Sequence, residues 1–218
     1  MRAQILQELR ESKIVAIVRG QPGEAMLALG AALAAGGIGF MEVTFRQDAP
    51  ETWRDTADAI AAVSGRFAGS MRVGAGTVLT LEQLEMARDA GAQFIISPNA
   101  DERIIRRTRA MGLLSVPGAF TATEIVQARE WGADIVKLFP AGRLGPDYLR
   151  DLRAPLPHIP LMAVGGVNEK NAAAFLAAGA SGLGVGGSLV RGEWVRAGEY
   201  ARITALAAEY ARIARETP

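Results

Sequence analysis

The sequence predicts an α/β fold built on one parallel sheet, and three observations lead to this prediction. Short apolar runs rich in β-branched residues alternate with alanine-rich helical stretches along the 218 residues. About eight such strand–helix units follow one another, and no linker or low-complexity segment divides them. Because about eight right-handed units can close on themselves, we predict a single-domain (β/α)8 TIM barrel over residues 1–218. A doubly wound open sheet is the alternative, but no Gly-x-Gly-x-x-Gly motif follows the first strand.

The predicted strands are short apolar runs separated by the helical stretches. They cover residues 14–19, 40–45, 72–78, 93–98, 113–118, 134–140, 161–166 and 181–188. Residues 1–12 precede the first strand and are charged throughout, so they predict a short amphipathic helix and not a secretory signal.

The predicted helices carry recognisable start and stop signals. Pro22 stands where one helix begins, a position at which its missing N–H costs nothing. Residues 80–83 (TLEQ) and 121–124 (TATE) match the capping box, in which Thr and a Glu or Gln satisfy each other's backbone amides. The endings AAGG, DAGA, EWGA and AAGA place glycine where a helix stops in the left-handed conformation.

The composition excludes several classes of function. Half of the residues are hydrophobic, which is enough for a sizeable core, and the net charge of +1 argues against nucleic acid or a membrane surface as partner. No apolar stretch approaches the roughly 20 residues of a transmembrane helix. The chain has no cysteine, which fits a cytoplasmic protein, and its only histidine, His158, lies in a predicted connection. We therefore expect no metal site.

Alternation along the strands predicts polar side chains inside the barrel. In the strand at 40–45 the outward residues are apolar, whereas Glu42, Thr44 and Arg46 point inward. In the strand at 134–140 the same rule sends Lys137 inward, beside Phe139. Active sites of this fold lie at the carboxyl ends of the strands, where most of these residues fall.

Two further polar residues are predicted to reach the same interior. Thr77 follows Val73 and Ala75 on one face of the third strand, and Arg19 ends the first strand on the inward face. The interior would then hold one lysine, one glutamate, two arginines and one threonine, which is a constellation suited to chemistry.

Lys137 is the candidate nucleophile. A lysine attacks a carbonyl only when it is neutral, and its free pKa is ~10.4, so apolar walls and neighbouring cations are needed to lower the pKa. Two arginines would supply cations and hold an anionic substrate, and Glu42 could move protons. These are the parts of an imine-forming lyase acting on a keto acid. A structural lysine paired with Glu42, or a structural Glu42–Arg46 pair, is the alternative.

Glycine pairs end the last two predicted strands and precede helices. Backbone N–H groups exposed at such turns bind anions, and the loops after strands seven and eight of TIM barrels often hold phosphate. The phosphate candidates are therefore Gly165, Gly166, Gly187 and Ser188. The alternative is that these glycines only make tight turns.

The chain resembles a family of bacterial aldolases. These enzymes cleave 2-keto-3-deoxy-6-phosphogluconate, its galactonate epimer or 4-hydroxy-2-oxoglutarate. The resemblance covers nearly the whole chain and runs in order through IVAIVRG, MEVTFR, VGAGTVLT, AQFIISP, VPGAFTATE, VKLFPA, VGGV and GVGGSLV. It implies a TIM barrel without a cofactor that acts on a phosphorylated keto acid, releases pyruvate and assembles as a homotrimer.

The resemblance also implies roles for residues of this chain. Lys137 corresponds to the Schiff-base lysine and Glu42 to the proton-transferring carboxylate, while Arg46 and Thr77 would hold the pyruvate part of the substrate. The implied pocket walls are Pro98 and Phe139, and the implied phosphate contacts are Gly166, Gly187 and Ser188.

One position departs from the pattern of many phosphogluconate enzymes. They carry threonine before the Gly-Gly of the seventh strand, where this chain has Val164, as phosphogalactonate enzymes do. Valine cannot donate a hydrogen bond to a substrate hydroxyl, whereas EVTFR and GGS are closer to the phosphogluconate side. Both C4 epimers therefore stay open as substrates.

Three other functions compete with this hypothesis. A 4-hydroxy-2-oxoglutarate aldolase would form the same imine and need no phosphate site. A sugar-phosphate isomerase or epimerase would use Lys137 electrostatically, without an imine. A sugar-phosphate sensor would bind the ligand without turnover.

Overall fold

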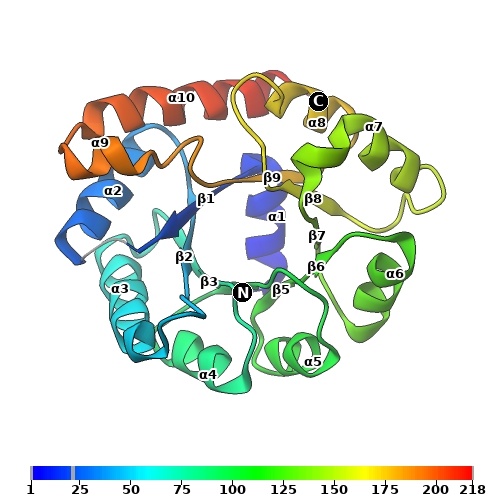
Figure 1. The fold of residues 1–218 in the computed structure, drawn as a ribbon, viewed down its shortest axis with the longest axis horizontal. Coiled ribbons are helices and arrows are strands. Elements are labelled where there is room, and N and C mark those ends of the chain that lie inside the picture. The colour runs from blue at the N-terminus through cyan, green and yellow to red at the C-terminus, as the bar shows by residue number, and fades with distance from the viewer. Residues whose placement is uncertain (1, 21–22, 218) are drawn as a thin grey trace.

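The strands form one parallel sheet that curls into a barrel. The computed structural model describes residues 2–20 and 23–217. Figure 1 looks into the ring of strands, with the helices α2 to α10 around its outside. The strand order is β5-β4-β3-β2-β1-β9-β8-β7-β6. The two end strands, β5 and β6, follow each other directly in the sequence, so the series closes into a ring. The predicted TIM barrel is confirmed.

The described residues form nine strands where about eight were predicted, because Pro117 divides the fifth. The strands are β1 (Ile14–Arg19), β2 (Phe40–Thr44), β3 (Arg72–Gly76), β4 (Phe94–Ile96), β5 (Leu114–Val116), β6 (Gly118–Ala119), β7 (Val136–Leu138), β8 (Leu161–Val164) and β9 (Gly182–Val185). Proline has no N–H to donate, so the ladder changes partner there. β5 pairs with β4 and β6 pairs with β7, while the N–H of Lys137 donates to the carbonyl of Pro117 at 2.8 Å.

Most predicted strands extend too far at their carboxyl ends. Only the first, residues 14–19, matches its prediction at both ends. The strand predicted at 72–78 stops at Gly76, and the one predicted at 181–188 stops at Val185. The residues beyond these ends belong to the loops at the barrel mouth.

The helices surround the barrel and begin and end largely as predicted. They are α1 (Arg2–Ser12), α2 (Gly23–Ala35), η1 (Pro50–Thr52), α3 (Trp53–Arg66), α4 (Leu81–Asp89), α5 (Glu102–Ala110), α6 (Ala122–Trp131), α7 (Ala141–Arg153), α8 (Ala172–Ala177), α9 (Gly192–Arg196) and α10 (Tyr200–Glu216). None of these helices is both long and apolar enough to cross a membrane.

The helix signals of the sequence are confirmed where the structure describes them. Both capping boxes form, with Thr80 bonded to Gln83 before α4 and Thr121 to Glu124 before α6. The glycines of the four helix endings adopt positive φ, and they are Gly37, Gly91, Gly132 and Gly179. Met1, predicted within the first helix, and Pro22 lie outside the described residues.

Alternation along the strands separates two apolar layers. The outer layer packs between strands and helices and includes Met41, Val43 and Leu138. The inner layer fills the barrel and includes Val15, Ile17, Phe40, Phe94, Leu114, Ile135, Met162 and Val164. Glycines make room for these large inward groups, since a Cβ on Gly74 would lie 2.3 Å from the ring of Phe94. The interior is thus a packed core that leaves space only near the mouth.

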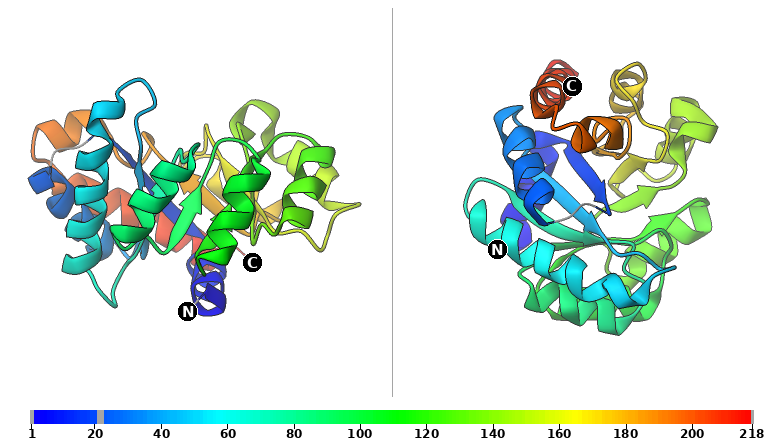
Figure 2. Two further views of the ribbon diagram at one scale, coloured as in Figure 1. Left: turned by 90° about the horizontal axis from the view of Figure 1, so that it is seen from below. Right: turned by 60° about the vertical axis from the view of Figure 1, so that its left-hand side comes forward.

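Helix α1 closes the end of the barrel where the strands begin. Its Ile5 and Leu9 are fully buried in the inner layer. Figure 1 shows α1 within the outline of the ring, and Figure 2 shows it at one end of the barrel. Arg2 pairs with Asp134 at 2.6 Å, and Glu8 pairs with Arg72 at 2.6 Å, so both ends of α1 are fixed to the barrel wall.

The plug formed by α1 gives a first prediction. Leu9→Ala should lower the free energy of unfolding by roughly 2–5 kcal/mol, because it removes a fully buried side chain and leaves a cavity. Urea unfolding followed by circular dichroism measures the change. Arg10→Ala on the exposed side of α1 is the matched control and should change it by less than about 0.5 kcal/mol. Equal effects of the two substitutions would contradict the plug.

Candidate active site

Lys137 lies in the barrel interior at the middle of β7. Only 5% of the residue is exposed, and its Nζ lies 4.6 Å from the centre of the Phe139 ring. The next inward residue toward the bottom of the barrel is Ile135, which belongs to the inner apolar layer. The amine therefore has an apolar floor and an aromatic wall, as the alternation of the sequence predicted.

Glu42 enters the same interior from β2 and is 2% exposed. The hydroxyl of Thr44 donates a hydrogen bond of 2.9 Å to Oε1 of Glu42. Oε2 is buried and has no hydrogen-bond partner among the described residues. Gly76 of β3 lies alongside, and a Cβ at this position would be 1.7 Å from Oε1. The carboxylate thus occupies space that any other residue at position 76 would remove.

The surroundings favour the neutral forms of both groups. Burial is the largest effect on Glu42 and raises its pKa, against the lowering effects of Lys137, the Thr44 hydrogen bond and Arg19. Burial is also the largest effect on Lys137 and lowers its pKa, against the raising effect of Glu42 and together with the lowering effect of Arg19. A lowered lysine pKa is the condition for nucleophilic attack.

The alternative of a structural salt bridge does not match this geometry. Within the described chain, no ion pair or hydrogen bond joins Lys137 to Glu42, and one carboxylate oxygen is left without a partner. A buried pair kept for stability would need good contact geometry to offset its desolvation. The structural Glu42–Arg46 pair is not formed either, because Arg46 pairs with Asp48.

Arg19 ends β1 and is exposed, so it lies at the mouth of the barrel and not in the buried interior. The residue pairs in register with Thr44 of β2, and a Cβ on Gly186 would lie 3.0 Å from its guanidinium. Its charge acts on both Glu42 and Lys137. Arg19 therefore contributes a cation at the mouth of the barrel, between β2 and the loop after β9.

The prediction that Arg46 points into the interior is wrong for this structure. β2 ends at Thr44, so strand alternation does not extend to Arg46. Its side chain is 52% exposed at the rim and pairs with Asp48 at 2.9 Å. Its carbonyl accepts a hydrogen bond of 2.7 Å from Nε1 of Trp53, which fixes the backbone of this loop.

The argument that placed Thr77 in the interior by strand alternation does not hold in the structure. Val73 and Ala75 face the helices in the outer layer, so a continued strand would send Thr77 outward with them. β3 instead ends at Gly76, and Thr77 adopts a φ of 55°. This left-handed conformation is uncommon for a non-glycine residue. Its carbonyl accepts a hydrogen bond of 2.7 Å from Nε2 of Gln47.

At or just beyond the carboxyl ends of β7, β4 and β8 lie the two predicted pocket walls, Phe139 and Pro98, and the predicted contact Val164. Phe139 follows β7 and is half-buried above the amine. Val164 ends β8 in the inner layer, where a Cβ on Gly184 would lie 2.8 Å from its side chain. Pro98 follows β4, and its carbonyl would lie 2.2 Å from a Cβ on Gly118. The structure thus brings all three to the carboxyl side of the strands.

The four phosphate candidates lie in the loops after β8 and β9. Gly165 and Gly166 have φ of 86° and 80°, which favours glycine. The N–H groups of Gly166, Gly187 and Ser188 donate no hydrogen bond to other described residues. Two adjacent loops with free N–H groups can bind an anion.

No helix begins directly behind these glycines, in contrast to the prediction. α8 starts only at Ala172 and α9 only at Gly192. The side-chain amide of Asn171 instead donates a hydrogen bond of 3.0 Å to the carbonyl of Gly166. Any anion site here would rest on loop N–H groups and not on a helix terminus.

Sequence reasoning missed the small residues that make space at the site. Gly76 gives room to Glu42, and Gly142 at the start of α7 packs on the loop after β8. The N–H of Gly142 donates a hydrogen bond of 2.7 Å to the carbonyl of Gly165, and a Cβ there would lie 2.8 Å from Gly166. The motifs GAGTV and FPAG contain these glycines, but only the neighbouring strands reveal what they accommodate.

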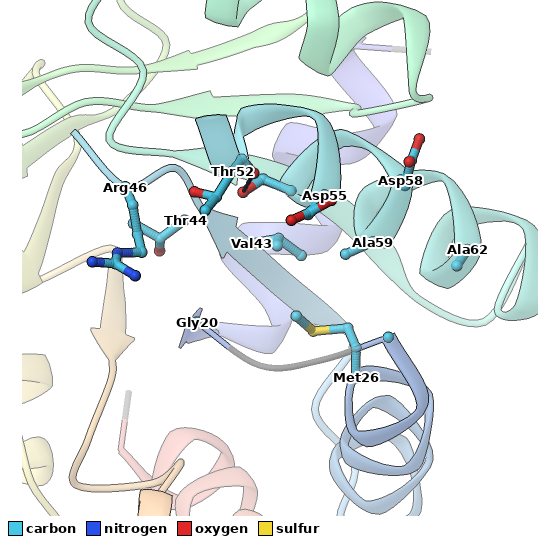
Figure 3. Close-up of a pocket in the computed structure, with 12 residues that line it drawn as sticks. Gly20, Met26, Val43, Thr44, Arg46, Thr52, Asp55, Asp58, Ala59 and Ala62 are labelled. Atoms are coloured by element: carbon cyan, nitrogen blue, oxygen red, sulfur yellow. Dashed lines mark hydrogen bonds between the residues drawn. The ribbon is translucent and has the colours of Figure 1, made fainter. Parts of the chain in front are cut away.

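A separate cavity of about 660 Å³ lies between α2 and α3, outside the barrel. Figure 3 shows Met26, Val43 and Ala59 along it, with Arg46 at the end near the barrel mouth. Among the described residues, neither Lys137 nor Glu42 lines this cavity. Thr44 and Arg46 do line it, so the cavity adjoins the site around the lysine at the carboxyl end of β2.

Comparisons with known proteins point to one family. A family model described as KDPG and KHG aldolase matches residues 5–206. A 2-dehydro-3-deoxy-6-phosphogalactonate aldolase of Escherichia coli (strain K12) is 39% identical over 82% of this chain and 84% of its own. A 2-dehydro-3-deoxy-phosphogluconate aldolase of Treponema pallidum (strain Nichols) is 36% identical over 96% of this chain and 97% of its own. Among solved structures, the KDPG aldolase of Legionella pneumophila superposes with a TM-score of 0.83 and is 27% identical over 92% of this chain and 94% of its own. That structure contains pyruvate captured as a covalent carbinolamine.

The buried charges of the site predict a cost in stability. The double variant Glu42→Gln/Lys137→Met should be as stable as the natural chain or more stable, by up to roughly 4 kcal/mol, because it removes two groups that burial penalises. Chemical unfolding of both proteins across a pH series measures the difference.

The pH dependence of that difference follows from the two pKa shifts. Because the pKa of Glu42 is raised, the free energy of unfolding of the natural chain falls relative to that of the double variant as pH rises through the folded-state pKa of Glu42. Because the pKa of Lys137 is lowered, the natural chain regains this free energy of unfolding as pH rises toward the unfolded-state lysine pKa of ~10.4. The advantage of the double variant should therefore be largest near neutral pH. A clearly less stable double variant at that pH would contradict the prediction.

Proposed function

The chain belongs to the KDPG and KHG aldolase family, and from that premise we propose that it cleaves a 2-keto-3-deoxy-6-phospho sugar acid through a Schiff base on Lys137. The products are pyruvate and glyceraldehyde 3-phosphate. The observation that carries this proposal is the buried lysine with a lowered pKa, which lies beside a buried carboxylate with one oxygen unpartnered among the described residues. The Legionella relative, with its covalent pyruvate carbinolamine, supports the imine chemistry.

The proposed reaction begins with attack of the neutral Nζ of Lys137 on the C2 ketone. The carbinolamine loses water and becomes a protonated imine. The C4 hydroxyl then gives its proton to Glu42, and the electron pair of the C3–C4 bond moves into the imine as the aldehyde leaves. The resulting enamine takes a proton at C3, and water hydrolyses the imine to release pyruvate and the free amine.

The other residues bind and orient the substrate in this proposal. Arg19 and Arg46 neutralise the carboxylate of the substrate. To do so, Arg46 leaves its exposed ion pair with Asp48 and pairs with the substrate instead. Phe139 and Pro98 line the pyruvate part, and Thr77 holds it from the loop after β3. The metal-free imine supplies the electron sink, so no cofactor is required.

The phosphate is proposed to bind to the loops after β8 and β9. Free N–H groups of Gly166, Gly187 and Ser188 support this assignment, and Gly165 allows the backbone to turn toward the anion. Val164 lies beside them without a hydrogen-bond donor for the C4 hydroxyl. The proposal therefore includes both the gluconate and the galactonate epimer, in line with the names of the two relatives.

A homotrimeric assembly in the cytoplasm is proposed from the family resemblance alone.

The alternative substrate within the family is 4-hydroxy-2-oxoglutarate, which carries no phosphate. A comparison of the two substrate types tests the role of the glycine loops.

The imine predicts a covalent adduct at one defined lysine. Reduction with borohydride in the presence of pyruvate should attach the reduced pyruvate to Lys137, because its amine is buried in the barrel interior and its pKa is lowered. Intact mass and peptide mapping measure the adduct. Lys13 and Lys170, the other two lysines of the chain, are internal controls, and Lys137→Ala should show no adduct. Adduct on Lys13 or Lys170 alone, or none at all, would refute the Schiff base at Lys137.

The phosphate loops predict a selective loss of affinity. Gly166→Ala should lower kcat/KM for the phosphorylated substrate roughly 10- to 100-fold, because a Cβ at φ 80° meets Gly142 at 3.0 Å and disturbs a charge-assisted hydrogen bond. Cleavage of 4-hydroxy-2-oxoglutarate should change much less. Gly112→Ala, outside the phosphate loops, is the matched control, since Gly112 has a similar φ of 76° and its Cβ meets nothing within 4 Å. Equal losses on both substrates would argue against phosphate binding at Gly166.

A further inference from the structure

The two oxygens of the Glu42 carboxylate have different surroundings. Oε1 accepts the 2.9 Å hydrogen bond from the hydroxyl of Thr44, two residues along the same strand. Oε2 is buried without a hydrogen-bond partner in the part of the chain that the structure describes. An unpartnered buried oxygen is costly, so its retention calls for a partner that arrives with the substrate.

Gly76 determines where this carboxylate can lie. A Cβ on Gly76 would be 1.7 Å from Oε1, 2.2 Å from the carboxyl carbon and 2.6 Å from Cγ of Glu42. The φ of Gly76 is not positive, so its backbone does not itself require glycine. The absence of a side chain is therefore needed for Glu42 and not for the strand.

The charged groups that act on Glu42 come from two other strands. Lys137 of β7 and Arg19 of β1 both lower its pKa, while Thr44 of its own strand adds the hydrogen bond. Thr44 is the only one of these three that is uncharged. Its removal would change the position of the carboxylate and one hydrogen bond, and would leave both cations in place.

We infer that Thr44 is a positioning residue that fixes Oε1 of Glu42 in the space left by Gly76, so that Oε2 is the oxygen that exchanges protons with the substrate. The inference rests on the proposed aldol cleavage. In that step Oε2 takes the proton of the C4 hydroxyl. The hydroxyl oxygen uses the electron pair of its former O–H bond to form the aldehyde carbonyl, and the electron pair of the C3–C4 bond moves into the imine. Neither Thr44 nor Gly76 touches the reacting atoms.

Steady-state cleavage by Thr44→Val, measured against pH, tests this role. The variant should lose roughly 10- to 100-fold in kcat with a smaller change in KM, because a misdirected carboxylate slows proton transfer. The acid limb of its kcat/KM profile should move upward by about one pH unit, since the lost hydrogen bond favoured the charged carboxylate. Thr44→Ser keeps the hydroxyl and should restore both the rate and the limb.

Gly76→Ala provides an independent variant that leaves Thr44 in place. The added methyl should displace the carboxylate and lower kcat by a similar factor. Gly39→Ala, just before β2, is the matched control, because a Cβ there meets nothing within 4 Å. Thermal unfolding of every variant identifies any that fails to fold.

Borohydride trapping with pyruvate separates this inference from the proposed function. No adduct in the natural chain would overturn the aldolase proposal, and the inference with it. An adduct in the natural chain, with natural kcat and an unmoved acid limb in Thr44→Val, would overturn the inference alone. A folded Thr44→Ser no better than Thr44→Val would also overturn it, since the hydroxyl would then have no role.

Discussion

The burial of Lys137 and Glu42 in one interior is the constraint on which the rest of the structure depends. Desolvation lowers the pKa of the amine and raises that of the carboxyl, whereas direct pairing would favour the charged forms of both. The barrel keeps the groups close enough to interact and without a hydrogen bond between them. The burial that lowers the lysine pKa is thus expected to reduce the free energy of unfolding, as happens where function and folding compete.

Much of the remaining barrel serves to keep this interior apolar and rigid. Below the lysine, the inner layer is filled by large side chains, and α1 covers the end where the strands begin. Asp134 accepts hydrogen bonds from Arg2 and Arg109 at 2.6 and 2.7 Å and from the N–H of Ser115, which ties α1, α5 and β5 together. The buried carboxylate of Asp134 is therefore fully paired, whereas Oε2 of Glu42 has no hydrogen-bond partner among the described residues.

The parts of the site that could be predicted from sequence lie inside regular strands. Strand alternation placed Glu42 and Lys137 correctly, because both sit within β2 and β7. It does not apply to Arg46 and Thr77, since each follows the end of its strand, where the regular alternation stops. The fit of Gly76 against Glu42 depends on the register of β2 with β3, which a single sequence does not state.

The plug at the bottom also determines how molecules come and go. With α1 packed into the end where the strands begin, a substrate of the proposed reaction would approach Lys137 from the side of the loops that follow the strands. The group attached to the amine is then the innermost part of any bound substrate, and the phosphorylated part is the outermost. On the proposed reaction, the aldehyde must depart before pyruvate can. Synthesis in the reverse direction would require the opposite order of binding, with pyruvate entering first.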